Sequence, residues 1–339
     1  MSLRIISASF IAVCSLFVFA GSAVAACEPD GEVQFVCGPI SPEDLLVIPD
    51  TPWVVTSGYE AEGYLYLVDT RDHSYREVFP VASAKAEPDT STYGACRDLP
   101  STQFQAHGLG LRPGANGKHT LYVVAHGGRE AVEVFNLDAS GSVPELTWIG
   151  CVEAPDGVSL NSVAPLLETD NDFIATNLNI SAGQSWEWSP ATGWAQVPGS
   201  EMPGPNGIVV SPDGRWLYVG GWMDGSLMRL SRGQDPVRKD VIKVGFHVDN
   251  VHWAPDGSLL VAGQYFEDMA SAGKCMGGGE CDGVSSRVVR VDPDELTIEQ
   301  VIDYPSNDFF IFGTAAIEVG EEIWFGGIAG GDRIGRFPL

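Results

Sequence analysis

The sequence predicts an all-β protein, a six-bladed β-propeller that forms a single domain from residue 26 to residue 339. Short runs of β-branched and aromatic residues recur along the chain, and turn residues bound each run, as expected for strands. Helical periodicity is scarce, and no Pro/Ser-rich linker or run of charge divides the chain. The clearest strand segments are residues 64–69, 120–125, 131–135, 216–221, 259–263 and 323–327.

An internal repeat predicts the number of blades. The segment Ser211-Pro-Asp-Gly, followed by an apolar strand, is echoed 43 residues later by Ala254-Pro-Asp-Gly. Proline presets the first turn residue and glycine accepts a positive φ, so each segment makes a tight connection between two strands. A period of about 40 to 50 residues with four short strands per unit is typical of propellers. The roughly 310 residues that follow residue 25 therefore predict about six blades.

The N-terminal residues predict export. Arg4 gives a positive start, an apolar run covers residues 5–20, and residues 21–25 have the small-x-small pattern that signal peptidase cleaves. We therefore expect residues 1–25 to be a signal peptide and the mature protein to be periplasmic or secreted. One alternative is a lipoprotein, because the segment that ends at Cys27 loosely fits a lipoprotein box and would place a lipid on that residue.

Cysteine usage favours simple cleavage and disulfide bonds. Cys14 leaves with the signal peptide, and the six cysteines that remain form an even set. Outside the cytoplasm such a set most often forms disulfides. A cysteine-rich metal cluster is disfavoured, since the sequence has no Cys-x-x-Cys motif. The predicted pairs are Cys275–Cys281, which flank a Gly-rich loop, then Cys27–Cys37 and, from the two that remain, Cys96–Cys151.

The chain is strongly acidic. It has 19 basic and 45 acidic residues and a formal net charge of −26 at pH 7. Such a surface repels nucleic acid and anionic lipid, so we expect neither as a partner, and no membrane association unless Cys27 is lipidated. The charge suits a well-solvated protein and carries no information about catalysis.

Five oxygen-bearing residues precede or interrupt apolar strand segments, where polar side chains are unexpected. Taken singly, each has a simple structural explanation, such as a hairpin turn, a cap or a solvated carboxylate. Taken together, three of the five are asparagines that recur at offsets of 45 and 44 residues, close to the blade period. Equivalent positions on successive blades face the same central channel. The five residues are Glu43, Asn161, Asn206, Asp249 and Asn250.

These five side chains predict a central calcium site. Three amide oxygens and two carboxylates form an all-oxygen set, and Ca²⁺ takes about six to eight oxygen ligands. The carboxylates balance the charge of the ion, and its remaining positions stay open for water or substrate. Zinc or copper would call for histidine or cysteine among the ligands.

Two histidines are candidates for catalysis. His107 and His126 each lie beside a predicted strand and each precede a glycine. A single histidine is more often structural, but two of them one hairpin apart can form a dyad in which one orients the other. Histidine is the natural base near neutral pH. His247 and His252, which flank Asp249-Asn250, are the lower-ranked alternatives.

Several segments together resemble the paraoxonase/arylesterase family, and they cover nearly the whole mature chain in the family's order. The paired histidine segments are the more specific ones, whereas Asn206-Gly-Ile with its Ser-Pro-Asp-Gly is shared with the wider gluconolactonase and strictosidine-synthase-like propellers. The segments are 42–45, 106–109, 122–135, 160–161, 205–214, 248–250 and 313–327.

The resemblance implies a six-bladed propeller that hydrolyses lactones and aryl esters with a catalytic calcium. It implies that the five oxygen-bearing residues hold this ion, that His107 activates water and that His126 assists it. Members of the family also bind a second, structural calcium. Asp44 and the carbonyl of Leu109 remain as ligands for it here, but Ser162 stands where the family has an aspartate.

The expected activity is hydrolysis of a small-molecule lactone or carboxylic ester, with the substrate carbonyl polarised by Ca²⁺. Two alternatives stay open: a non-catalytic, calcium-stabilised propeller that binds a protein or glycan, and a different enzyme of the superfamily such as a sugar lactonase. Aromatic residues either line an apolar pocket or pack within the blades. They are Trp186, Trp188, Trp222, Tyr265, Phe309 and Phe310.

Overall fold

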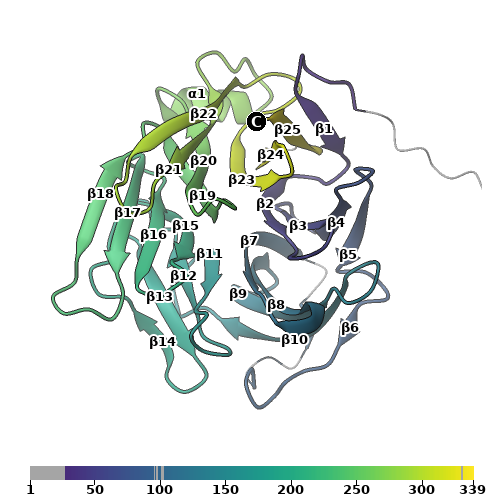
Figure 1. Ribbon diagram of the computed structural model, residues 1–339, viewed down its shortest axis with the longest axis vertical. Helices are drawn as coiled ribbons and strands as arrows, with labels where there is room; N and C mark the ends of the chain where they lie inside the picture. Colours follow the sequence, from purple (N-terminus) through teal and green to yellow (C-terminus); the bar gives the residue numbers. More distant parts are fainter. Residues whose placement is uncertain (1–26, 95, 97, 101–102, 330) are drawn as a thin grey trace, which may run out of the picture.

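The protein, seen here as a computed structural model, is an all-β propeller of six blades arranged around a central channel (Figure 1). The structure describes residues 27–94, 96, 98–100, 103–329 and 331–339. The predicted signal peptide, residues 1–25, lies outside these ranges. Each blade contains four antiparallel strands, and in five of the six blades these strands follow one another in sequence outward from the channel. The innermost strands are β2 (Pro42–Val47), β7 (Phe104–Arg112), β11 (Leu160–Pro165), β15 (Pro205–Val210), β19 (His247–Trp253) and β23 (Gly313–Val319).

The remaining strands complete each blade from the channel to the rim. The second strands are β3 (Trp53–Gly58), β8 (Lys118–Gly127), β12 (Phe173–Asn177), β16 (Trp216–Gly221), β20 (Leu259–Tyr265) and β24 (Glu322–Gly327). The third strands are β4 (Leu65–Asp69), β9 (Ala131–Asp138), β13 (Gln184–Ser189), β17 (Ser226–Ser231), β21 (Ser285–Val291) and β25 (Arg333–Pro338). The outer strands are β5 (Tyr75–Phe79), β10 (Glu145–Glu153), β14 (Gly193–Gln196), β18 (Lys239–Lys243), β22 (Ile298–Pro305) and β1 (Gln34–Cys37).

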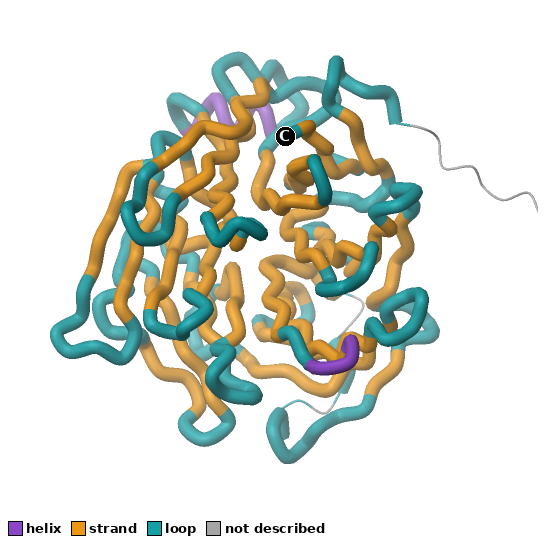
Figure 2. The backbone as a smooth tube through the Cα atoms, viewed as in Figure 1, coloured by secondary structure: helices purple, strands orange, loops and turns teal. Residues whose placement is uncertain are grey.

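Helix is a minor component, as Figure 2 shows. The loop between β20 and β21 carries α1 (Met269–Met276), the 3-10 turn η1 (Ala115–Gly117) precedes β8, and β6 (Lys85–Ala86) adds a fifth strand to the second blade. Within the described ranges, no helix is long and apolar enough to cross a membrane.

The ring is closed by pairing the two ends of the chain. The N-terminal strand β1 runs antiparallel to β25, with Gln34 opposite Arg336 and Cys37 opposite Arg333. The last blade therefore takes its outer strand from the start of the chain and its other three from the end. The predicted disulfide Cys27–Cys37 encloses this strand. Unfolding of either terminus would thus open the ring.

The repeated Pro-Asp-Gly segments lie where the repeat predicted them. Each connects an innermost strand to the second strand of its blade, β15 to β16 and β19 to β20. Gly214 and Gly257 take φ values of +71° and +86°, which glycine adopts without a steric penalty. The core consists of apolar faces packed between neighbouring sheets, with Trp53, Trp148 and Trp324 among the largest fully buried side chains.

The three predicted disulfides are present: Cys27–Cys37, Cys96–Cys151 and Cys275–Cys281. Three such bonds indicate an oxidising compartment. Cys96–Cys151 ties the long loop before β7 to the outer strand β10.

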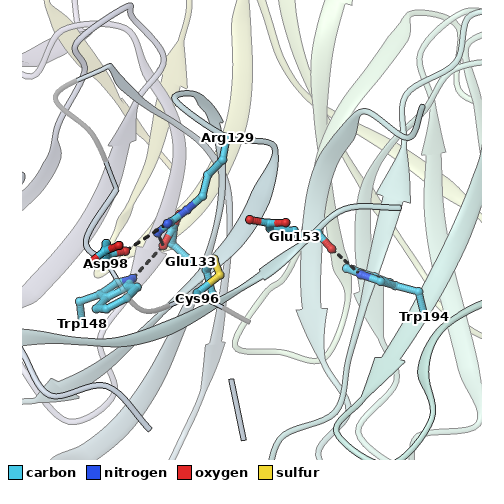
Figure 3. The surroundings of a disulfide bond; sticks show 8 residues. Cys96, Asp98, Arg129, Glu133, Trp148, Glu153 and Trp194 are labelled. Atoms are coloured by element: carbon cyan, nitrogen blue, oxygen red, sulfur yellow. Dashed lines mark hydrogen bonds and ion pairs between the residues drawn. A yellow bond between two sulfur atoms is a disulfide. The ribbon is translucent and has the colours of Figure 1, made fainter. Parts of the chain in front are cut away.

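An ion pair between half-buried Arg129 and buried Glu133 fixes the same loop to the second blade (Figure 3). The guanidinium of Arg129 donates to both carboxylate oxygens of Glu133, at 2.6 and 2.8 Å, and also to the backbone carbonyl of Asp98 at 3.1 Å. Trp148 donates its indole N–H to Glu133 at 2.7 Å. The β8–β9 turn, which contains Arg129, is therefore held rigidly from two sides.

Candidate functional site

Each innermost strand carries a β-bulge near the end at which it enters the channel. The register of each strand with its neighbour shifts by one residue there, and every predicted channel residue lies within such a bulge. In a regular strand, side chains alternate between the two faces of the sheet. A bulge changes the direction of the side chains at that point, and bulges recur beside active sites. The shifts fall between Pro42/Leu45, Ala106/Leu109, Leu160/Val163, Pro205/Ile208, Val248/Val251 and Gly313/Ala315.

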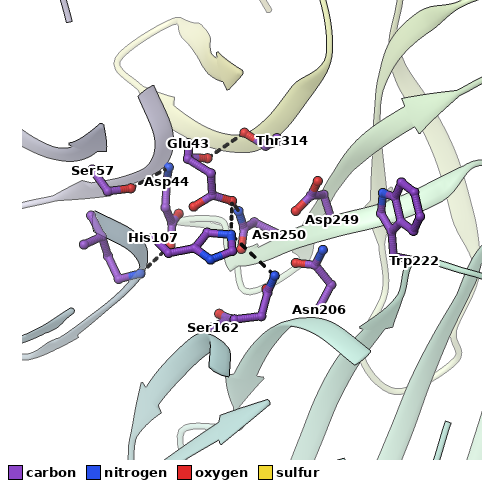
Figure 4. A network of polar contacts seen from close by, with 12 residues as sticks. Glu43, Asp44, Ser57, His107, Ser162, Asn206, Trp222, Asp249, Asn250 and Thr314 are labelled. Atoms are coloured by element: carbon purple, nitrogen blue, oxygen red, sulfur yellow. Dashed lines mark hydrogen bonds and ion pairs between the residues drawn. The ribbon is translucent and has the colours of Figure 1, made fainter. Parts of the chain in front are cut away.

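The bulges bring the five predicted oxygen-bearing side chains together in the channel, all of them buried (Figure 4). The amide nitrogen of Asn250 donates to Glu43 Oε1 at 2.7 Å, which joins β19 to β2 across the channel. Asp249 Oδ2 accepts from the amide of Gln264 at 2.7 Å. Asn161 and Asn206 reach the same group from β11 and β15. Side chains separated by up to 207 residues in sequence thus form one cluster.

Three oxygens of this cluster lack a hydrogen-bond donor. They are Glu43 Oε2, Asn161 Oδ1 and Asn206 Oδ1, and all three are buried. A buried acceptor without a partner costs about 1–3 kcal/mol, so three at one point call for a shared partner. Because all three are hard oxygen acceptors, a cation of the calcium type fits them. The residues present therefore fit the predicted ion.

The buried carboxylates of the cluster also favour a cation. Burial, and then repulsion from Asp44 and Asp249, raises the pKa of Glu43 well above its usual value. Burial is also the main cause that raises the pKa of Asp249 to about 7. A bound cation would offset both effects. Within the described part of the chain, no three His, Cys, Asp or Glu side chains group as a metal site, so the asparagine oxygens would be essential ligands.

The two candidate histidines form a dyad that ends on a carboxylate. His107 Nδ1 lies 2.9 Å from His126 Nε2, and His126 Nδ1 lies 2.7 Å from Glu130 Oε2. A carboxylate only accepts, so His126 donates from Nδ1 and its Nε2 accepts from His107 Nδ1. His107 Nε2 is then left with a lone pair. Glu130 is itself fixed, since its Oε1 accepts from the backbone N–H of Leu160 at 2.6 Å.

The Nε2 atom of His107 faces the oxygen cluster. It accepts a hydrogen bond from the amide nitrogen of Asn161 at 3.4 Å and lies 3.8 Å from Glu43 Oε1. The ring of Tyr59 packs on His107 with centroids 4.2 Å apart. Burial, and then the neighbouring His126, lowers the pKa of His107 well below its usual value. His107 therefore presents a neutral, basic nitrogen beside the candidate ion site.

The two lower-ranked histidines have other partners. His247 Nδ1 lies 2.6 Å from the carbonyl of Trp222, and its ring stacks on Phe266 with centroids 4.0 Å apart. His252 Nε2 lies 2.7 Å from Asp44 Oδ1. Neither is part of the dyad.

The residues expected at a second calcium are engaged within the protein. Asp44 accepts from the backbone N–H of Leu109 at 2.7 Å, so Leu109 meets it with its amide group rather than with its carbonyl. Ser162 lies in the neighbouring bulge of β11, and its Oγ lies 3.4 Å from the backbone nitrogen of Ile208.

Aromatic residues divide between the site and the blade interiors. Trp222 lies on the side of the cluster where Asp249 lies (Figure 4). Its indole N–H donates to Gln264 at 2.8 Å, and Gln264 in turn donates to Asp249. Trp188 and Phe310 instead pack in the cores of their blades. Of the six aromatic candidates, Trp222 is the one that the hydrogen bonds link to the cluster.

Two residues of the site were not predicted. Glu130 lies four residues after His126, across the β8–β9 turn, and a carboxylate one turn from a candidate histidine is a signal that the sequence does contain. Gln264 is the penultimate residue of β20 and has no such signal, because it meets Asp249 only through the pairing of β20 with β19.

No protein-family model matches the sequence, and no curated protein matches it. Solved structures do resemble the fold. A gluconolactonase from Xanthomonas campestris has a TM-score of 0.56 at 13% identity, over 91% of this chain and 89% of that chain. A luciferin-regenerating enzyme has a TM-score of 0.56 at 9% identity, over 90% and 94% of the two chains. A catalytically inactive virginiamycin B lyase from Staphylococcus aureus has a TM-score of 0.52 at 15% identity, over 91% and 99%. At these identities the likeness establishes the propeller fold alone.

Proposed function

We propose that the protein is a calcium-dependent hydrolase of lactones or aryl esters, of the type implied by its resemblance to the paraoxonase/arylesterase family. The observation that carries the proposal is the position of His107 Nε2. This nitrogen is the last atom of the hydrogen-bonded series Glu130–His126–His107, and it faces the oxygen cluster, 3.8 Å from Glu43 Oε1. A general base and an electrophilic site in contact are the two components that ester hydrolysis requires.

The residues of this chain divide the work of the reaction. Glu43, Asn161, Asn206, Asp249 and Asn250 would hold calcium, which supplies positive charge beside a substrate carbonyl oxygen. His107 Nε2 takes a proton from the attacking water, whose pKa of about 16 makes such help necessary at neutral pH. His126 and Glu130 hold the ring of His107 in the tautomer that can accept this proton. The water oxygen bonds to the carbonyl carbon, the C–O bond to the leaving oxygen breaks, and His107 passes the same proton to that oxygen. An aryl ester then gives a carboxylic acid and a phenol, and a lactone gives one hydroxy acid.

The test is an activity panel of lactones and aryl esters, with and without removal of calcium. We expect hydrolysis of at least one class, loss of that activity in calcium-free protein and its recovery when calcium is restored. Magnesium in place of calcium is the matched control, because its smaller, octahedral coordination suits this set poorly. An intact, folded protein that binds calcium and hydrolyses none of the panel would favour the alternative, a calcium-stabilised propeller that binds a protein or glycan.

A further inference from the structure

Asp44 is a buried carboxylate that the proposed reaction does not use. It follows Glu43 in the bulge of β2, and it is fully buried. A buried carboxylate requires a partner, either a cation or a set of hydrogen-bond donors. Which of the two holds Asp44 determines how many ions the channel binds.

The protein itself supplies the partners of Asp44. Its Oδ1 lies 2.7 Å from His252 Nε2 and accepts from the backbone N–H of Leu45 at 2.8 Å. Its Oδ2 accepts from the backbone N–H of Leu109 at 2.7 Å. These contacts join three innermost strands, β2, β7 and β19. Both oxygens of the carboxylate are thus engaged by donors.

The surroundings offer little to a second ion. His252, Leu109 and Ser162 line one pocket of about 440 Å³, whose walls are mainly apolar. Ser162 stands where the family resemblance calls for an aspartate, and its hydroxyl faces the backbone nitrogen of Ile208. Glu318 is the one carboxylate among the described residues that line this pocket, and it already forms an ion pair with Arg290. A Ca²⁺ ion here would therefore have to displace His252 to gain its only carboxylate ligand.

We infer that His252 takes the place of the second, structural calcium implied by the family resemblance, so that this protein binds a single calcium ion. At this point the strands β2 and β19 are joined instead by the hydrogen-bonded pair His252–Asp44, which needs no metal. The predicted number of ions rests on the proposed function, which places one calcium at the cluster of five oxygen-bearing residues. The role of His252 does not depend on that ion.

The first experiment compares His252→Ala with His119→Ala in the full-length mature protein. His119 is a matched control, since it is 6% exposed against 7% for His252 and its one hydrogen bond is to a backbone N–H. We expect His252→Ala to lower the melting temperature in calcium-free buffer by about 5 °C or more beyond the control, because it leaves buried Asp44 with two backbone donors and without its only side-chain partner named here. Equal losses in the two variants would overturn the inference.

The second experiment counts calcium ions per chain by metal analysis after equilibrium dialysis. We expect one ion in the wild type and two in the exchange variant Ser162→Asp/His252→Ser, which restores a second carboxylate and removes the imidazole. Two ions in the wild type, or one in a folded exchange variant, would overturn the inference. If the exchange variant does not fold, the wild-type count and the first experiment still decide. A wild type with no calcium would refute the proposed function, while the calcium-free melting comparison would still test His252.

Discussion

The Nδ1 atom of His107 lies 2.9 Å from Nε2 of His126, so the two rings share one hydrogen bond although they come from neighbouring strands of the second blade. This contact connects the surface turn at Glu130 to the buried oxygen cluster. It also fixes the tautomers of both rings, since the carboxylate of Glu130 accepts a hydrogen bond from His126 Nδ1.

Glu130→Gln should impair catalysis without removing either histidine. The glutamine oxygen can still accept from Leu160, but its amide nitrogen then faces His126 and donates where the carboxylate accepted. That change favours the opposite tautomer in both rings and places a proton on His107 Nε2. We expect kcat to fall roughly 10- to 100-fold with little change in melting temperature. Glu62→Gln, an exposed change of the same type, is the control, and an unchanged kcat in Glu130→Gln would show that the carboxylate does not orient the dyad.

Asn206→Ala should affect the calcium-loaded and the calcium-free protein differently, because Asn206 Oδ1 has no hydrogen-bond donor. With calcium present the variant loses a ligand, so we expect its calcium affinity to fall by at least about 10-fold and its melting temperature to fall with it. Without calcium it loses a buried acceptor that had no donor, together with the amide that donates to Asp249, so its melting temperature should fall by less than it does with calcium. Asn179→Ala, at an exposed turn, should behave alike in both buffers. A loss of stability in Asn206→Ala that ignores calcium would contradict the site.

The stabilising effect of calcium should grow with pH. In calcium-free protein the folded-state pKa values of Glu43 and Asp249 are raised, that of Asp249 to about 7. Groups with raised folded pKa values favour folding below their unfolded values near pH 4 and lose that contribution as pH rises through about 7. Bound calcium cancels the loss, which is on the order of a few kcal/mol. The melting-temperature difference between calcium-loaded and calcium-free protein should therefore be small near pH 5 and large near pH 8. A difference independent of pH would argue against these carboxylates as ligands.

The fold was predictable because its signals are local and repeated. The two Pro-Asp-Gly segments, 43 residues apart, lie between the first and second strands of neighbouring blades, as their spacing predicted. The offsets between Asn161, Asn206 and Asn250 have the same origin, since equivalent bulges place them at one level of the channel. The periodicity of the sequence thus predicted that these three side chains lie close together in the structure.

The remaining parts of the site depend on contacts that no local pattern encodes. Gln264 meets Asp249 because β20 pairs with β19, and His252 meets Asp44 across 208 residues of sequence. The ring closure by β1 is equally non-local, because four residues near the N-terminus complete a blade built at the C-terminus. Such relationships follow from the three-dimensional arrangement of the blades and cannot be read from spacing.

Replacing Cys27 and Cys37 by serine should weaken the closure of the ring. This bond encloses β1, and a loop of its size stabilises by about 2–3 kcal/mol in the chain-entropy account. We expect a melting temperature lower by several degrees, with activity retained, because β1 is the outermost strand of its blade. The same pair of changes at Cys275 and Cys281 is the control for a local loop. Peptide mapping without reductant should find all three bonds, and a lipid-modified Cys27 would refute both this pairing and simple export.

His107→Gln should separate catalysis from calcium binding. Glutamine keeps a polar side chain of similar reach but cannot accept a proton near neutral pH, and His107 is not among the five proposed ligands. We therefore expect calcium affinity and melting temperature to stay close to those of the wild type. General-base catalysis contributes about 10²- to 10⁴-fold, so kcat for a lactone with a poor leaving group should fall by that range. Activated aryl esters need less help from a general base, so the kcat for these substrates should fall less.

The comparison that decides the role of the dyad uses three variants measured on one lactone. His119→Gln, a change at a buried histidine away from the channel cluster, should keep its activity. His126→Gln should lose less than His107→Gln, because His126 orients the base and does not itself face the oxygen cluster. Calcium affinity measured on each variant excludes loss of the ion as the cause. Full lactonase activity in His107→Gln, together with its loss in Asp249→Ala, would make the dyad structural. The reaction would then depend on the carboxylate and the ion, with Asp249 as the base or nucleophile.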